Sequence, residues 1–182
     1  MAEDSIQPPI EFETPRLRLR QWQESDLAPF AALAADPLVM EFLLPVPTRA
    51  DSDALAARIR ARIAEQGWGL WAVEHKASGE FAGFTGLNVP LAALPFSPCV
   101  EIGWRLARKW WGQGLATEAA RAALQVGFER LGFEEIVAFT ALGNHRSAAV
   151  MERLWTGGEC DVKAMHRLMA ARHITLNTVQ ST

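Results

Sequence analysis

The segment from residue 101 to residue 131 constrains the fold of this chain more than any other. The residues around 100–106 have the pattern of a β-strand, and residues 115–131 repeat apolar side chains at helical spacing. A short turn with Gly112 and Gly114 lies between them. This order predicts that the free backbone N–H groups at the start of the helix converge on one spot. Such a spot binds a phosphate or pyrophosphate without a charged side chain.

Two familiar phosphate-binding loops do not fit this turn. A Walker loop needs Lys and then Ser or Thr after its last glycine, whereas Leu115 and Ala116 follow Gly114. The dinucleotide loop expects Gly or Ala where Thr117 stands, and an acidic residue at the end of the next strand, which here ends in Thr140. Taken alone, the turn is equally compatible with a simple connection between a strand and a helix.

The rest of the chain predicts one α+β (mixed α/β) domain, with a central, mostly antiparallel sheet flanked by helices. We expect a flexible leader over 1–12 and one domain over 13–182, of which 154–182 is atypical. Further strands are expected over 16–22, 69–74, 80–89, 135–140 and 172–179, with a turn at 77–79. Helices are expected over 24–35, from Thr48 or Asp51 to a stop at Gly67, and from a cap at Asn144 to Leu154.

Composition limits the function. The chain has 182 residues and a formal net charge of -3, so no overall positive field attracts nucleic acid or an anionic membrane. Cys99 and Cys160 have no metal-ligand spacing, and we expect no metal. The first ten residues lack the pattern of a signal peptide, and no apolar run is long enough to span a membrane. We expect a cytoplasmic protein without nucleic-acid or membrane partners, and a homodimer is compatible with the sequence.

Four separated motifs resemble the GNAT superfamily of acetyltransferases, and most closely its ribosomal-protein alanine acetyltransferase branch (RimJ/RimL-like). The first two motifs are the opening 13–20 and residues 83–87. The third is Lys109-Trp110-Trp111-Gly112-Gln113-Gly114 with its continuation to Ala120, which matches the family's Gln/Arg-x-x-Gly-x-Gly/Ala loop except at its first position. The fourth is 144–147 followed by 150–154. The resemblance implies an N-acetyltransferase that uses acetyl-coenzyme A.

The resemblance also implies how acetyl-coenzyme A is bound. Its pantetheine arm would pair with the backbone of Trp104, Arg105 and Leu106. Asn144 and Ser147 would contact the pantetheine or the phosphate end. The pyrophosphate would rest on backbone N–H groups of the loop, formed by Trp111, Gly112, Gln113, Gly114, Leu115, Ala116 and Thr117.

Acetyl transfer to an amine needs a base for the amine, a donor for the oxyanion and a proton for the leaving thiolate. Some family members carry their base at the strand position of Glu101, although a solvated or salt-bridged glutamate at the end of a strand is an equal alternative. The oxyanion donor is expected to be a backbone N–H near Arg105 or Leu106. Many relatives use a tyrosine as acid, and this chain has none. Ser147 is the candidate, with a plain helix-backbone hydrogen bond as its alternative.

The acceptor is expected to be a primary amine, of a small molecule or a peptide, and Trp22, Phe42, Trp71 and Phe84 are candidates to line its site. After Leu154 the chain departs from the family pattern, which affects the strands that normally close this site. Two other functions stay open. One is a protein that binds acetyl-coenzyme A without catalysis, as a sensor or an interaction module. The other is an enzyme of a different phosphate-bearing cofactor.

Overall fold

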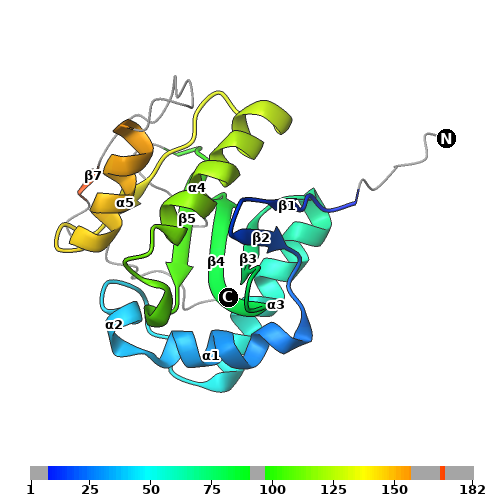
Figure 1. Cartoon of the computed structure of the whole chain (residues 1–182), viewed down its shortest axis with the longest axis vertical. Helices are drawn as coiled ribbons and strands as arrows, with labels where there is room; N and C mark the ends of the chain where they lie inside the picture. Colours follow the sequence, from blue (N-terminus) through cyan, green and yellow to red (C-terminus); the bar gives the residue numbers. More distant parts are fainter. Residues whose placement is uncertain (1–7, 91–96, 157–168, 171–182) are drawn as a thin grey trace.

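A five-stranded antiparallel sheet forms the centre of the molecule, with the strands in sequence order (Figure 1). The computed structural model describes residues 8–90 and 97–156, and the backbone of 169–170. The strands are β1 (Phe12–Glu13), β2 (Leu17–Arg20), β3 (Leu70–His75), β4 (Glu80–Asn88) and β5 (Glu101–Leu106). This arrangement confirms the predicted α+β class.

Beyond β5 the sheet continues only at one end of that strand. The N–H of Ile102 donates to the carbonyl of Val137 (2.9 Å), and the N–H of Val137 donates to the carbonyl of Val100 (2.8 Å). Farther along the same segment, β6 (Phe139–Thr140) pairs in parallel with β7 (Met169–Ala170) instead. Within the described residues, no strand pairs with residues 103–106 on the side away from β4. Residues 103–106 of β5 therefore have an open edge among the described residues.

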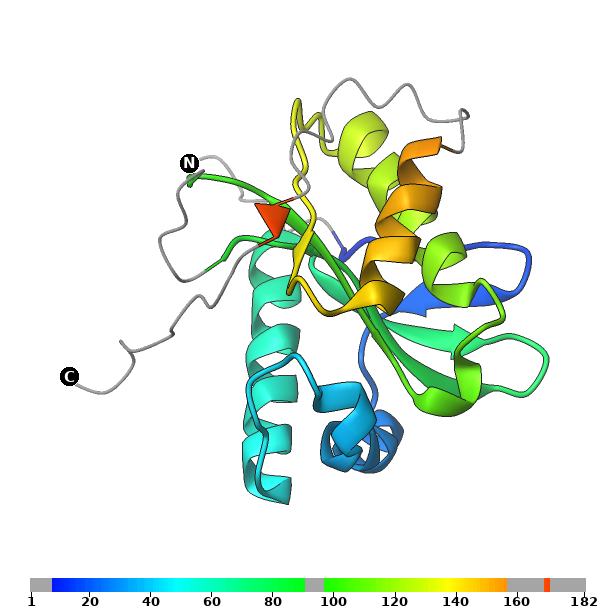
Figure 2. The ribbon, with the colours of Figure 1, turned by 90° about the vertical axis from the view of Figure 1, so that its left-hand side faces the viewer.

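Helices cover both faces of the sheet (Figure 2). One face carries η1 (Glu24–Asp26), α1 (Leu27–Ala35), α2 (Pro37–Met40) and α3 (Arg49–Gln66). The other face carries α4 (Leu115–Gln125), its π-helical continuation η3 (Val126–Arg130) and α5 (His145–Thr156). A short helix, η2 (Arg108–Trp110), connects β5 to the loop before α4. Each face has its own buried apolar cluster, as expected for a sheet between two helical layers.

Local chemistry explains where the helices begin and end. Thr48 caps α3 through a reciprocal pair of hydrogen bonds with Asp51, so both residues considered for this cap take part in it. Gly67 ends α3 with a φ of 81°, and Gly132 follows η3 with a φ of 70°, both as expected for left-handed stops.

Two local predictions are refined. Asp26, within the segment 24–26 expected to supply the cap, does so: its carboxylate accepts at 2.8 Å from the backbone N–H of Gln23, the N-cap of η1, and Asp26 is itself the N-cap of α1. Asp36 and Pro37 end α1, as expected, but they also start α2, because the Asp36 carboxylate accepts from the N–H of Leu38 at 3.0 Å.

Residues 10–12 fall within the leader predicted for 1–12, but they already contact the domain. The Ile10 N–H donates to Gly67, its carbonyl accepts from the Trp71 indole at 2.7 Å, and Phe12 already belongs to β1. The strand expected over 172–179 lies outside the described residues. No described helix has the length and apolar character required to cross a membrane.

A buried ionic group connects the sheet to the helical layer of η1, α1, α2 and α3, called the α1 layer below. Arg20 on β2 makes a two-pronged contact with the Asp26 carboxylate (2.7 and 2.9 Å), and its Nε donates to Glu74 on β3 at 2.7 Å. Arg20 and Asp26 are 5% and 2% exposed, so water does not compete for these contacts. The Asp26 hydrogen bond is the main reason that the pKa of Arg20 is raised. The start of α1 is therefore fixed relative to β2 and β3.

Candidate active site

The open edge of β5 presents backbone groups in alternation. Since the N–H of Ile102 points toward Val137, the N–H groups of Trp104 and Leu106 point the same way, whereas those of Gly103 and Arg105 point toward β4. The three residues expected to bind pantetheine therefore differ in the direction of their N–H groups. Trp104 and Leu106 offer their N–H groups at the open edge, whereas the Arg105 N–H lies within the pairing with β4.

The loop after β5 leads from this edge to the start of α4. The indole of Trp111 donates to the Leu106 carbonyl at 2.8 Å, which occupies that carbonyl and fixes the loop on the strand. Gly112 and Gly114 have φ values of 74° and 76°, and a Cβ on Gly112 would stand in open space. Gly114 is the N-cap of α4 and supplies no side chain to bond the first N–H groups of the helix. These N–H groups have no helical partner and are available to an anion.

Arg16 holds the loop from the side of β2, and the sequence reasoning did not identify it. Its Nη1 donates to the Gln113 carbonyl at 2.9 Å, and it makes an ion pair with Glu118 on α4 at 2.6 Å. Burial alone would raise the pKa of Glu118, but hydrogen bonds from Thr14 and Arg16 hold it below its usual value. The backbone carbonyl of a residue between two turn glycines needs a hydrogen-bond donor from elsewhere in the chain. This requirement is the one sequence feature that could have indicated a partner such as Arg16.

The first turn of α5 lies against the same loop. The Asn144 side-chain oxygen accepts from the N–H of Ser147 at 3.1 Å, which confirms its predicted role as a cap. The guanidinium of Arg146 lies 4.6 Å from the centre of the Trp111 ring and pairs with Glu41, just after α2, at 2.9 Å. Loop, α5 and α2 therefore meet around Trp111. Ser147 is half-buried in this turn.

Glu101 begins β5 where the strand is still joined to the segment around Val137. Its Oε1 accepts from the Asn88 side-chain nitrogen at 2.7 Å, and Asn88 in turn accepts from Arg62 on α3 at 2.9 Å. Burial raises the pKa of the Glu101 carboxyl, and the Asn88 hydrogen bond offsets part of that rise. The sequence reasoning did not identify Asn88 or Arg62, because both lie far from Glu101 along the chain.

The aromatic residues expected at the acceptor site have different positions. Trp71 is fully buried in the apolar cluster beneath α4, and Trp22 packs in the α1 layer against Phe30 and Phe81. Their large apolar rings fill the core, so the expectation that they line a cavity is corrected. Phe84 is 6% exposed and lies under the Arg105 guanidinium, at 5.1 Å.

Phe42 contacts the chain just before α5. A Cβ placed on Gly143 would lie 3.3 Å from the Phe42 ring, so the two backbones approach closely here. The ring is half-buried, and of the four predicted aromatic residues it is the one that keeps appreciable exposure.

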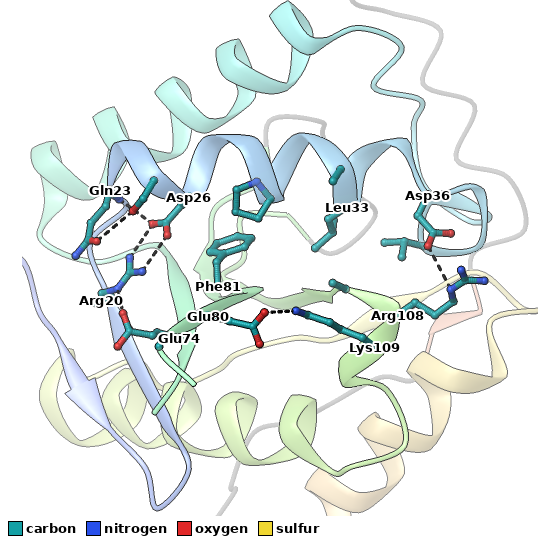
Figure 3. A pocket seen from close by; sticks show the side chains of 16 residues that line it. Arg20, Gln23, Asp26, Leu33, Asp36, Glu74, Glu80, Phe81, Arg108 and Lys109 are labelled. Atoms are coloured by element: carbon teal, nitrogen blue, oxygen red, sulfur yellow. Dashed lines mark hydrogen bonds and ion pairs between the residues drawn. The ribbon is translucent and has the colours of Figure 1, made fainter. Parts of the chain in front are cut away.

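A separate cavity of about 730 Å³ lies between α1, the β3–β4 turn and η2 (Figure 3). Arg20 and Asp26 lie at one end of it and the ion pair of Arg108 with Asp36 lies at the other, with the ion pair of Lys109 and Glu80 between them. These charges are already paired, and none of the predicted catalytic or cofactor residues lines the cavity. The candidate active site is therefore the open edge of β5, and not this cavity.

The fold and the site define an acetyltransferase of the GNAT family. The chain belongs to this family, because the profile of the Acetyltransferase (GNAT) domain matches residues 16–154.

Several known proteins are similar to the chain. The uncharacterized protein YkkB of Bacillus subtilis is 34% identical over 142 residues, which cover 78% of this chain and 81% of YkkB. A crystal structure of an acetyltransferase from Agrobacterium tumefaciens superposes with a TM-score of 0.69 at 28% identity, covering 80% of this chain and 82% of the other. The structure of RimL, a ribosomal alpha-N-protein acetyltransferase in complex with coenzyme A, superposes with a TM-score of 0.65 at 19% identity, covering 80% and 82%.

GNAT enzymes transfer an acetyl group from acetyl-coenzyme A, and the residues present fit that cosubstrate. The uncapped start of α4 and the left-handed Gly112 and Gly114 suit a pyrophosphate. The Thr117 hydroxyl, in the same helical turn, is buried without a hydrogen-bond partner among the described residues. Within that part of the chain, no three His, Cys, Asp or Glu side chains are grouped as a metal site would require.

Proposed function

We propose that the chain is an N-acetyltransferase that passes the acetyl group of acetyl-coenzyme A directly to a primary amine within a ternary complex. One observation carries the proposal. The open edge of β5 leads at one end to an anion cradle at Gly112 and Gly114, and at the other to the buried carboxyl of Glu101. Such an edge suits an extended donor whose reactive end must reach a base.

In this proposal acetyl-coenzyme A, the acetyl donor, is bound mainly by backbone N–H groups. The pyrophosphate rests on the N–H groups of residues 111–117, and the pantetheine lies along the open edge at Trp104 and Leu106. Asn144 and Ser147 contact the acetyl donor from α5. The oxyanion was expected near Arg105 or Leu106. Because the Arg105 N–H faces β4, we assign the oxyanion to one of the two open N–H groups, that of Trp104 or Leu106, and a pantetheine carbonyl to the other.

Glu101 is proposed as the general base. The amine nitrogen attacks the thioester carbon, the carbon–sulfur bond breaks, coenzyme A leaves as a thiolate, and the amine proton passes to Glu101 directly or through water. A carboxyl with a raised pKa holds a proton more strongly than an exposed one, which suits a base near neutral pH. Asn88 keeps the carboxylate oriented by donating to Oε1.

The thiolate needs a proton from a group other than tyrosine, since the chain contains none. Ser147 is proposed for this role, because it lies in the first turn of α5, next to the Trp111 loop. Its contribution is expected to be small, because a thiolate leaves readily without an acid.

Other parts of the proposal rest on the sequence alone. They are a RimJ/RimL-like acceptor preference, with a protein N-terminus or a small molecule as the amine, a cytoplasmic location, and a possible homodimer. Nucleic acid and membranes are not expected as partners, and no metal is required.

Calorimetry with acetyl-coenzyme A, followed by thiol release with a panel of amines, tests the proposal. We expect binding, and thiol release with at least one amine or N-terminal peptide. Binding with no release across the panel would favour the acetyl-coenzyme A sensor instead. No binding at millimolar acetyl-coenzyme A would exclude both functions.

A further inference from the structure

The side chain of Arg105 is a partly buried cation, and two of its nitrogens lack hydrogen-bond partners in the described part of the chain. Its Nε and Nη1 are buried and have no hydrogen-bond partner among the described residues. Its one described partner is the face of the Phe84 ring, 5.1 Å from the guanidinium carbon. Burial lowers the pKa of this guanidinium to about 10, which leaves it charged at neutral pH. A buried donor without an acceptor is destabilising, so a partner for these nitrogens is favoured.

The described acids around Arg105 are already engaged elsewhere. Asp36 and Glu41, which flank α2, pair with Arg108 and Arg146. Glu101 lies four residues away along β5 and bonds to Asn88. Asp26 in η1 and Glu74 on β3 pair with Arg20, and Glu24 in η1 pairs with Arg60. This part of the molecule therefore contains a cation for which the described chain supplies no anion.

Arg105 and Glu101 lie on the same face of the sheet, separated by a gap. Residues two apart on a strand share a face, so Glu101, Gly103 and Arg105 all point toward the α1 layer. Gly103 has no side chain, and a Cβ there would meet only Leu70, at 4.0 Å. On this face, β5 thus carries a base at one end and a cation at the other, and the residue between them has no side chain.

We propose that Arg105 binds a carboxylate of the acceptor, so that the acceptors are amines that also carry an acidic group. A guanidinium offers two parallel N–H donors that match the two oxygens of a carboxylate. This inference rests on the proposed function, since it places the amine at Glu101. It adds a substrate class that the fold and the family do not specify.

The spacing along β5 limits the length of such an acceptor. Four strand residues span about 13 Å at roughly 3.3 Å each. Glu101 contacts its cross-strand neighbour Asn88 and Arg105 contacts its cross-strand neighbour Phe84, so we take this strand spacing as the separation of their polar ends. Two hydrogen-bond contacts of about 3 Å, one at each end, leave on the order of 7 Å between the amine and the carboxylate. An α-amino acid such as glycine is too short for this span. An extended ω-amino acid such as 6-aminohexanoate, or a short peptide, has the required length.

The test compares 6-aminohexanoate with its uncharged amide, 6-aminohexanamide, and with glycine. For the wild-type protein, kcat/KM for the acid is expected to exceed that for the amide at least 30-fold, mainly through KM, and glycine is expected to be poor. Arg105→Gln should remove the preference by raising KM for the acid, with the amide unchanged within about twofold. Arg105→Lys should restore part of it. Arg108→Gln, an exposed arginine beside the separate cavity, is the matched control and should keep the preference.

Binding of the same probes to the protein loaded with coenzyme A measures the inference without turnover. A preference for the acid that depends on Arg105, without thiol release from any amine, would support the carboxylate site and contradict the proposed catalysis. Equal affinity of acid and amide would overturn the inference, whether or not acetyl transfer occurs. A loss in Arg105→Gln that is equal for all acceptors and accompanied by a lower melting temperature would also overturn it, since it would indicate a partner within the chain.

Discussion

The proposed site has a side for the acetyl donor and a side for the amine acceptor, and the two sides consist of different chemical groups. The donor side consists of the open edge of β5, the glycine turn and the start of α4, and it offers mainly backbone N–H groups. The acceptor side consists of Glu101 and Arg105 beneath the α1 layer, and it offers side chains with unusual environments. A backbone site depends on conformation, whereas a side-chain site depends on identity and burial. Substitutions on the two sides should therefore have different consequences.

The largest expected effect is on the donor side. Gly114→Trp should weaken acetyl-coenzyme A binding about 1,000-fold, or about 4 kcal/mol, because a side chain at this left-handed position strains the turn and covers the N–H groups. Calorimetry measures the affinity. Gly79→Trp is the control, since Gly79 has a similar φ of 68° in the β3–β4 turn, outside the loop. Equal loss of affinity in both variants would mean that the loop has no special role.

The next effect concerns the stability of the α1 layer, which covers the acceptor side. Asp26→Ala should lower the free energy of unfolding by about 3 kcal/mol, because it leaves the buried Arg20 without its main partner. Urea denaturation measures this loss. Asp53→Ala, which removes an exposed pair with Arg49, should cost at most about 0.5 kcal/mol. An equally small effect in both variants would show that the buried group does not hold the α1 layer.

Removing the proposed base should slow catalysis and leave donor binding intact. Glu101→Gln should lower kcat/KM about 100-fold, as expected for the loss of a general base, with acetyl-coenzyme A affinity unchanged. Steady-state thiol release and calorimetry together separate the two effects. Undiminished turnover would assign Glu101 the purely structural role considered from the sequence.

The pH dependence should follow the environment of the same carboxyl. Since the base acts when ionised, kcat/KM should fall as the pH decreases through the raised pKa of Glu101. Asn88→Leu removes the hydrogen bond that lowers this pKa, so the acid limb of the profile should move to higher pH. A limb that stays in place would show that another group controls it.

The smallest effect is expected at Ser147. Ser147→Ala should lower kcat by about fivefold or less, because the thiolate leaves readily and the serine N–H still bonds to Asn144. Single-turnover kinetics measure this step directly. A loss of 100-fold or more would make Ser147 an essential acid.

The same contrast explains how much could be predicted from the sequence. Gly112, Gly114 and the helix start at Leu115 lie together in the sequence, and a local pattern is sufficient to identify them. The pairing of Arg16 with Glu118 joins residues more than a hundred positions apart, and no local pattern predicts it. The contacts of Glu101 with Asn88 and Arg62 depend in the same way on the packing of β4 and α3 against β5.

Hydrophobicity alone misled the prediction of the acceptor site. Trp22 and Trp71 were candidates because large aromatic rings often line pockets, but the same property places them in the core. Arg105 was considered only for its backbone, because a sequence does not show that two nitrogens of its side chain are buried without a described partner. A strand was expected over 135–140. This segment pairs with β5 only at Val137, beside the first residues of β5, and the edge of the remaining β5 residues is left open.

Amide hydrogen exchange resolved to single residues, with and without acetyl-coenzyme A, tests the central claim most directly. The N–H groups of Trp104 and Leu106 and those of residues 112–117 should gain protection when the donor binds. Those of Gly103 and Arg105, which already face β4, should change little. Donor binding without added protection at Trp104 and Leu106 would contradict the assignment of the open β5 edge as the acetyl-coenzyme A site.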